Sequence, residues 1–154
     1  MEDMKKYTIA VLQDLINTCK EEYSLFEKAS KKTEDPELKS LFSAYAQEKK
    51  EHFIKLESEI RRLGGSCKIN ENNSEKLEDF SKSFLHEDTQ EDLIAECLKK
   101  DDQTIRRYFN AIRKNILWEV VPLVAKQYFG SKNLHDQIRN VCIERVSRPI
   151  TTSV

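Results

Sequence analysis

The chain has 154 residues, of which 34% are charged, and it contains only three glycines and three prolines. Its length fits one domain with a real core, and its composition favours long solvated helices over an all-β fold. The net charge of −1 gives no reason to expect nucleic acid or an anionic membrane surface as a partner.

No apolar run reaches the roughly 20 residues that a helix needs to cross a bilayer. The first residues are charged and lack the apolar core of a signal peptide, so a cytoplasmic protein is predicted. Cysteines stand at positions 19, 67, 97 and 142 without C-x-x-C spacing. Free thiols are therefore expected, and neither disulfides nor a zinc site.

Apolar residues spaced three and four apart predict a helix over residues 5–32 and a second over 36–63. Asp35 suits the N-cap of the second helix, and Pro36 suits its first position. Gly64 and Gly65 are placed to end it. The short turn between the helices predicts an antiparallel pair.

The second half of the chain begins with a polar connection over residues 66–88, in which a short helix is predicted over 74–85. Further helices are expected over 90–117 and from about Trp118 or Glu119 onward. Pro122 is tolerable only in the first turn of the last helix. Residues 1–147 are predicted to form one domain, followed by a disordered tail over 148–154.

Two short patterns occur twice in the same order, which is typical of an internal repeat. The pattern D-L-I-x-x-C ends at Cys19 and again at Cys97, and Y-x3-K-x2-H ends at His52 and again at His135. Two helical hairpins joined by a long crossover predict an all-α, ferritin-like four-helix bundle. The two D-L-I-x-x-C segments should then be related by a pseudo-twofold axis.

Ferritin-like di-iron sites use one glutamate from each of two helices and Glu-x-x-His from each of the other two. His52 and His135 lie in the expected helices. Lys49 and Lys132 stand where the glutamates would be, and an ammonium group cannot act as a normal metal ligand.

Two interpretations of these polar residues remain open. In the favoured one, both lysines form ion pairs with acids of the other helices in a structural layer, and the histidines are hydrogen-bonded core residues. In the alternative, the layer binds iron or manganese. The ligands of that alternative are Glu22, Glu48, His52, Asp101 and His135.

Three stretches resemble a bacterial family of ferritin-like four-helix bundles of unknown function. They are Leu38–Phe42 with Ala46–Glu48 and Arg61–Gly65, Leu93–Cys97 with Asp101, Asp102 and Tyr108, and Val124–Tyr128 with His135–Arg139. The chain departs from the family pattern at Lys100–Asp102 and at Tyr23, positions that a metal site would use. The resemblance implies the fold and a stress-related role, and it implies no established activity.

No strong catalytic motif is present, so a non-catalytic protein that acts by self-association or by binding an unknown protein partner is predicted. A homodimer is suggested by a second apolar row on the first helix, formed by Ile9, Val11 and Leu25, and by Trp118 near Val120. The alternative function is a di-metal carboxylate protein that handles metal or peroxide.

Overall fold

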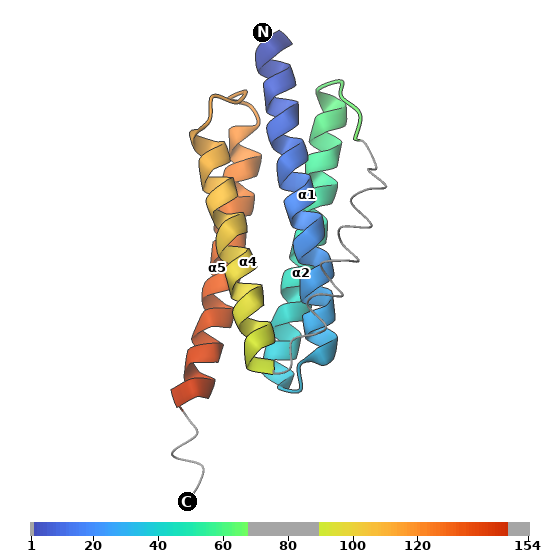
Figure 1. Ribbon diagram of the computed structural model, residues 1–154. Coiled ribbons are helices and arrows are strands. Elements are labelled where there is room, and N and C mark those ends of the chain that lie inside the picture. Colours follow the sequence, from blue (N-terminus) through green and yellow to red (C-terminus); the bar gives the residue numbers. More distant parts are fainter. Residues whose placement is uncertain (1, 68–89, 148–154) are drawn as a thin grey trace, which may run out of the picture.

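The structure is a computed structural model that describes residues 2–67 and 90–147. These residues form four helices and no strand: α1 (Glu2–Lys32), α2 (Pro36–Arg62), α4 (Gln90–Arg113) and α5 (Val121–Ser147). The helices lie side by side as a four-helix bundle (Figure 1). The predicted short helix over 74–85 and the predicted disordered tail over 148–154 lie outside the described residues. None of the described helices is long and apolar enough to cross a membrane.

The first hairpin is formed by the predicted capping residues. Asp35 accepts hydrogen bonds from the backbone N–H groups of Glu37 and Leu38, at 2.9 and 3.3 Å. At the other end of α2, Gly64 has a φ of 85°, which is costly for residues with a side chain. The Gly65 N–H donates to the Ile60 carbonyl at 2.9 Å, so an otherwise unsatisfied carbonyl of the last turn gains a partner.

Contacts between the helices fix their directions. Lys100 binds Glu21 while Tyr108 contacts Cys19, so α4 runs antiparallel to α1. Lys49 binds Ser131, and the carbonyl of His52, further along α2, accepts a hydrogen bond from Gln127. Because Gln127 lies nearer the start of α5 than Ser131 does, α2 and α5 are antiparallel, as their ribbons show (Figure 1).

Because α2 is antiparallel to α1, α2 and α4 point in the same direction (Figure 1). Each helix packs mainly against two others, and α2 and α4 lie across a diagonal. The residues on either side of the undescribed segment, Cys67 and Gln90, therefore lie at opposite ends of the bundle.

The second hairpin differs from its prediction. Helix α4 ends at Arg113 and not at residue 117, and α5 begins at Val121. Ile116 continues the apolar spacing of α4, but it lies in the connecting turn, and its side chain is buried in the bundle. The Leu117 N–H donates to Thr8 Oγ1 of α1 at 3.0 Å, so this backbone group is satisfied by another helix and not by a continuation of α4.

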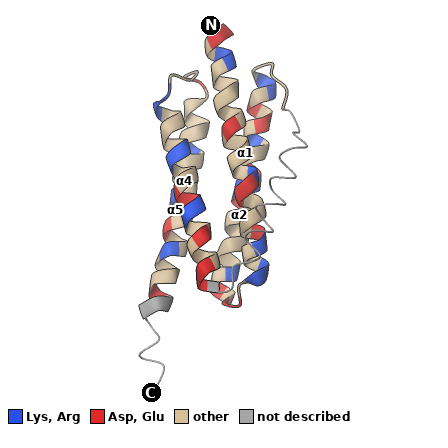
Figure 2. Cartoon of the chain, viewed as in Figure 1, with Lys and Arg blue, Asp and Glu red and all other residues tan. Residues whose placement is uncertain are grey.

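The apolar core forms two clusters along the bundle. One contains Cys19, Leu56 and Val124, and the other contains Phe26 and Cys97. Charged residues of both signs are interleaved along the outside of the helices (Figure 2). Cys19 and Cys97 are both fully buried, and all four cysteines are free.

The second apolar row predicted on α1 is not a free surface. Val11 and Leu25 are buried, and Ile9 packs against the core. The row is covered because α1 contacts α2 on one side and α4 on another.

Candidate functional site

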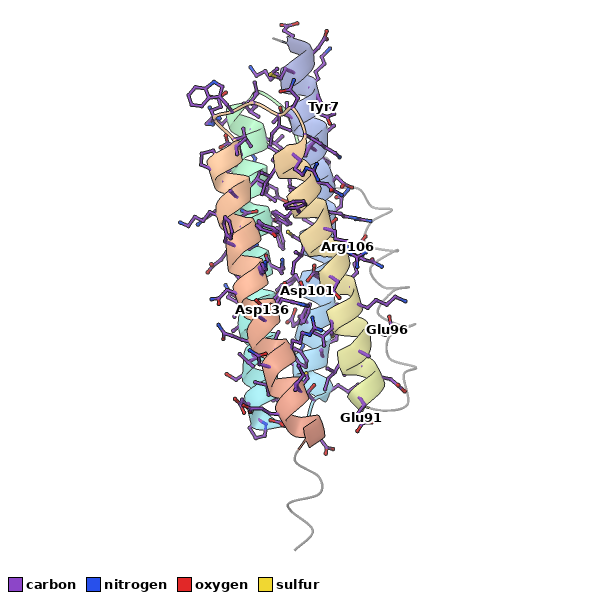
Figure 3. The ribbon with its side chains drawn as sticks, turned by 90° about the vertical axis from the view of Figure 1, so that its left-hand side faces the viewer. Tyr7, Glu91, Glu96, Asp101, Arg106 and Asp136 are labelled. Carbon is purple, nitrogen blue, oxygen red and sulfur yellow. The ribbon has the colours of Figure 1, made fainter. Side chains whose placement is uncertain are left out.

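A layer of buried polar side chains lies in the interior of the bundle, and each of the four helices contributes to it. We call these side chains the polar layer: Glu22 from α1, Tyr45 and Lys49 from α2, Asp101 from α4, and Ser131 and His135 from α5. None of them exposes more than 5% of its surface. Asp101 is labelled among the side chains between the helices in Figure 3.

The ammonium group of Lys49 is fully buried and still has partners. It donates to Ser131 Oγ at 2.7 Å and lies over the rings of Tyr45 and Tyr108, 4.9 and 5.6 Å from their centroids. Burial lowers the pKa of Lys49, but the surrounding acidic groups, including Glu22 and Asp101, outweigh it and raise the pKa above its ordinary value. Lys49 is therefore a buried cation.

Asp101 is the anion of the polar layer. Its Oδ1 accepts a hydrogen bond from the Tyr45 hydroxyl, and its Oδ2 lies 2.5 Å from His135 Nδ1. Burial raises the pKa of Asp101, but the His135 hydrogen bond, the Lys49 charge and a hydrogen bond with Glu22 together bring the pKa below its usual value. Asp101 therefore stays ionised at neutral pH.

Glu22 differs from Asp101 because no N–H or hydroxyl of a neighbouring residue reaches its buried carboxyl oxygens. Burial raises the pKa of Glu22 well above its usual range, and the adjacent charge of Asp101 raises it further. Glu22 therefore keeps its proton to a higher pH than an ordinary glutamate, and in that form it can donate a hydrogen bond to Asp101. The two carboxyl groups share one proton because both cannot be charged side by side in the interior.

His135 connects the polar layer to the surface. Its Nε2 lies 3.1 Å from Oδ1 of Asp102, whose side chain is 48% exposed. The hydrogen bond with Asp101 is the main cause that raises the pKa of His135, while burial lowers it. An imidazolium between these two aspartates has an acceptor for each of its N–H groups.

A second hydrogen-bonded group lies beside the polar layer. The Tyr108 hydroxyl donates to Gln127 Oε1 at 2.8 Å and lies 3.0 Å from the Cys19 sulfur. Gln127 Nε2 donates to the backbone carbonyl of His52 at 3.2 Å. Burial raises the pKa of the Cys19 thiol to about 11, so this thiol is not a nucleophile at neutral pH.

Comparison with known protein families matches residues 7–114 to a domain of unknown function, DUF2383. The match covers more than half of the chain. The chain belongs to the DUF2383 family. A comparison with curated proteins gave no match.

The DUF2383 match begins in the second turn of α1, covers α2 and α4, and ends just after α4. Glu22, Lys49 and Asp101 lie within the matched residues, whereas Ser131 and His135 lie outside them. Three of the four helices that build the polar layer therefore belong to the DUF2383 region.

The structure brings together some of the candidate metal ligands of this DUF2383 protein. Glu22, Asp101 and His135 are in one group, but Glu48 and His52 form a separate pair on α2 with 3.5 Å between His52 Nε2 and Glu48 Oε1. Burial lowers the pKa of His52, so this histidine is neutral at neutral pH.

The prediction that Lys132 joins the polar layer is wrong, because its side chain is exposed. Ser131, one residue earlier, is fully buried and binds Lys49. The side chains of the two Tyr-x3-Lys-x2-His patterns therefore point in different directions in the two hairpins. Tyr45 and Lys49 face the interior of α2, whereas on α5 only His135 does so and Tyr128 is partly exposed. Ser131 was missed because a single serine in a helix carries no signal of its own.

The side chains of the polar layer differ from the donor set of the ferritin-like di-iron site described above. Among the residues that the structure describes, no group of three or more His, Cys, Asp or Glu side chains is placed to hold a metal ion. The Lys49 ammonium already supplies a positive charge beside Asp101 and Glu22. A divalent cation among these residues would be repelled by that ammonium and would compete with protons for Glu22, whose pKa is raised.

Proposed function

We propose that this protein is a non-catalytic, ferritin-like helical bundle that acts by binding another protein chain through exposed aromatic residues of α4 and α5. The ferritin-like assignment is supported by the two hairpins and by the parallel directions of α2 and α4. The stress-related role and the cytoplasmic location expected from the sequence stay predictions.

The burial of the reactive side chains argues against catalysis in the interior. Glu22 and Lys49 are completely buried, Asp101 is 1% exposed, and each contacts another member of the polar layer. A substrate would have to break these contacts and separate the helices to reach them. Such closed networks are better suited to fix how helices pack than to turn over a ligand.

The surface offers a different kind of site, and this observation carries the proposal. Phe129 is 66% exposed and Phe109 is 45% exposed, and both rings contact Tyr128, at centroid distances of 5.1 and 6.0 Å. We call Phe109, Tyr128 and Phe129 the aromatic patch. Adjacent exposed aromatic side chains are typical of protein–protein interfaces.

Photo-crosslinking in the producing cell tests the proposal. A photoreactive benzoylphenylalanine in place of Phe129 should give a discrete protein adduct. The same group at Asp14, an exposed position on α1 across the bundle from α5, should not. Absence of any adduct at position 129, or equal adducts at both positions, would overturn the proposed function.

The metal-handling alternative rests on one observation: Glu22 is a buried carboxyl group without a donor from its neighbours, and it lies beside Asp101. Elemental analysis of protein purified without chelators distinguishes the two functions. Stoichiometric iron or manganese that is lost in Asp101→Ala would favour the alternative.

A further inference from the structure

A row of exposed residues follows the outer face of α5. We call it the outer row: Ala125, Phe129, Lys132, Asp136, Arg139 and Ile143. All are exposed except Ala125, which is partly exposed, and Ile143 exposes 56% of its surface. The spacing alternates between four and three residues, which keeps the row on one side of a helix and is the spacing of a coiled-coil seam.

The apolar pattern of α5 fits a helix with two contact faces. Ser131, His135 and Ile138 point into the bundle, and the outer row occupies a different face of the helix. Apolar residues gather on one face of α4, whereas on α5 they are distributed around the helix. A surface helix with one buried face is expected to resemble α4.

The charges of the outer row are complementary to those of a second copy of the same row that runs in the opposite direction. If two copies of α5 pack antiparallel about a twofold axis beside residue 134, Lys132 of each copy faces Asp136 of the other. Phe129 then faces Arg139, and Ala125 faces Ile143. The layers contain an ion pair, a cation–aromatic contact and a small residue against a large one, and the symmetry forms each of them twice.

The other pairing of the same two helices is unfavourable. In a parallel, in-register pair, each residue faces its own copy. Lys132, Asp136 and Arg139 would each meet a like charge in turn, which is the arrangement that coiled coils use to exclude a partner.

The charged residues of the outer row are available for such contacts. Among the side chains that the structure describes, within residues 2–67 and 91–144, no salt bridge includes Lys132, Asp136 or Arg139. Lys132 and Asp136 are four apart, but lysine before an acid is the weaker order for an ion pair within one helix. Asp136 lies on α5 at a height along the bundle close to that of Asp101 (Figure 3).

We infer that the partner of the aromatic patch is a second copy of this chain, and that the two copies pair through antiparallel α5 helices along the outer row. This inference rests on the proposed function. By the rise of 1.5 Å per residue, residues 125–143 extend over roughly 27 Å. One helix pair of this length buries about 1,200 Å² in total, which is at the lower end of the size range of specific interfaces. We therefore expect a dimer that dissociates at micromolar concentration.

Charge reversal tests the register. Lys132→Asp places two aspartates opposite two aspartates, and Asp136→Lys places two lysines opposite two lysines. Each single variant should raise the dimer Kd roughly tenfold, since two exposed ion pairs become two repulsions. The double variant Lys132→Asp/Asp136→Lys restores both pairs and should return to within about threefold of the wild type.

Analytical ultracentrifugation from low micromolar to a few hundred micromolar concentration gives the readout, and thermal unfolding checks that each variant is folded. Lys126→Asp is the matched control, because Lys126 is exposed on α5 outside the outer row. The inference is overturned if the wild type stays monomeric, if the single variants match the control, or if the double variant does not recover. A crosslink from position 129 to a different protein, with a monomeric wild type, would overturn self-pairing and keep the proposed function.

Discussion

Lys49 of α2 and Ser131 of α5 are joined by a hydrogen bond of 2.7 Å inside the bundle, and both side chains are fully buried. This contact places a permanent positive charge beside Asp101 and Glu22. The polar layer thereby contains its own cation, carried by the chain.

Removal of the buried anion should destabilise the fold strongly. Asp101→Ala removes a nearby negative charge that favours the Lys49 cation, and it leaves Tyr45 and His135 without their acceptor. We therefore expect a loss of about 3–5 kcal/mol in the free energy of unfolding. Asp101→Leu combined with Lys49→Met should cost much less than Asp101→Leu alone, since no buried charge is left unpaired. Urea unfolding of the wild type, the two single variants and the double variant measures this coupling. Asp102→Ala is the control, because the Asp102 side chain is half exposed. Additive effects would show that the two charges do not interact.

Glu22→Gln should be close to neutral in stability near pH 5, where the Glu22 carboxyl is protonated in the folded protein. The protonated carboxyl of Glu22 donates one hydrogen bond to Asp101, and the amide of glutamine can donate in its place. Asp101→Asn, which removes the buried charge itself, should be far more damaging. Denaturant unfolding of both variants checks this, and a large loss in Glu22→Gln would mean that Glu22 is ionised.

The pH dependence of stability should differ between the wild type and Glu22→Gln. The pKa of Glu22 is raised in the folded state, so above about pH 4.5 the folded protein binds more protons at this group than the unfolded chain. The stability that Glu22 contributes is present at low pH and decreases as the pH rises toward its folded pKa. The difference between wild type and variant in unfolding free energy should fall from pH 5 to pH 8, and a constant difference would contradict the assignment.

The pKa of His135 should lie above that of an ordinary histidine, and the pKa of His52 should lie below it. The hydrogen bond with Asp101 raises the pKa of His135, and burial lowers the pKa of His52. NMR titration of the imidazole signals, assigned with His135→Gln and His52→Gln, measures both. Asp102→Asn should lower the pKa of His135 and leave that of His52 unchanged. The same direction of shift at both histidines would rule out this electrostatic arrangement.

Gly130→Ala should be neutral or stabilising, by up to about 1 kcal/mol, because alanine is the better residue inside a helix. The added Cβ would lie 2.5 Å from Glu48 Oε1, and this carboxyl group is the end of a flexible side chain that can move. Gly64→Ala is the matched control, because its φ of 85° disfavours alanine. Thermal unfolding of both variants measures the two effects. Strong destabilisation by Gly130→Ala would show that the Glu48 side chain cannot move.

The sequence predicted the bundle and most of the residues in its interior, but not how they pair. Helix periodicity placed Glu22, Asp101 and His135 on inward faces, and the structure puts them in one polar layer. The error at Lys132 has a geometrical cause. A repeated spacing fixes the angles between residues of one helix, but not the rotation of that helix against its neighbours.

The contact between Lys49 and Ser131 depends on that rotation and on two helices far apart in the sequence. The outer row of α5 was hidden for a related reason. Lys132 was assigned to the interior, so the complementary charges of Lys132 and Asp136 could not be recognised as a surface feature. The exposure of the apolar row on α1 was mispredicted for the same reason. Which rows of a helix stay exposed depends on how it packs, and α1 packs against both α2 and α4.

If Lys49 and a proton on Glu22 complete the polar layer, a metal ion should not stabilise the fold. The test is thermal unfolding of chelator-treated wild-type protein with and without added Mn²⁺ or anaerobic Fe²⁺. We expect the same melting temperature in the presence and absence of either metal. A rise on metal addition that is absent from Glu22→Gln would contradict that expectation.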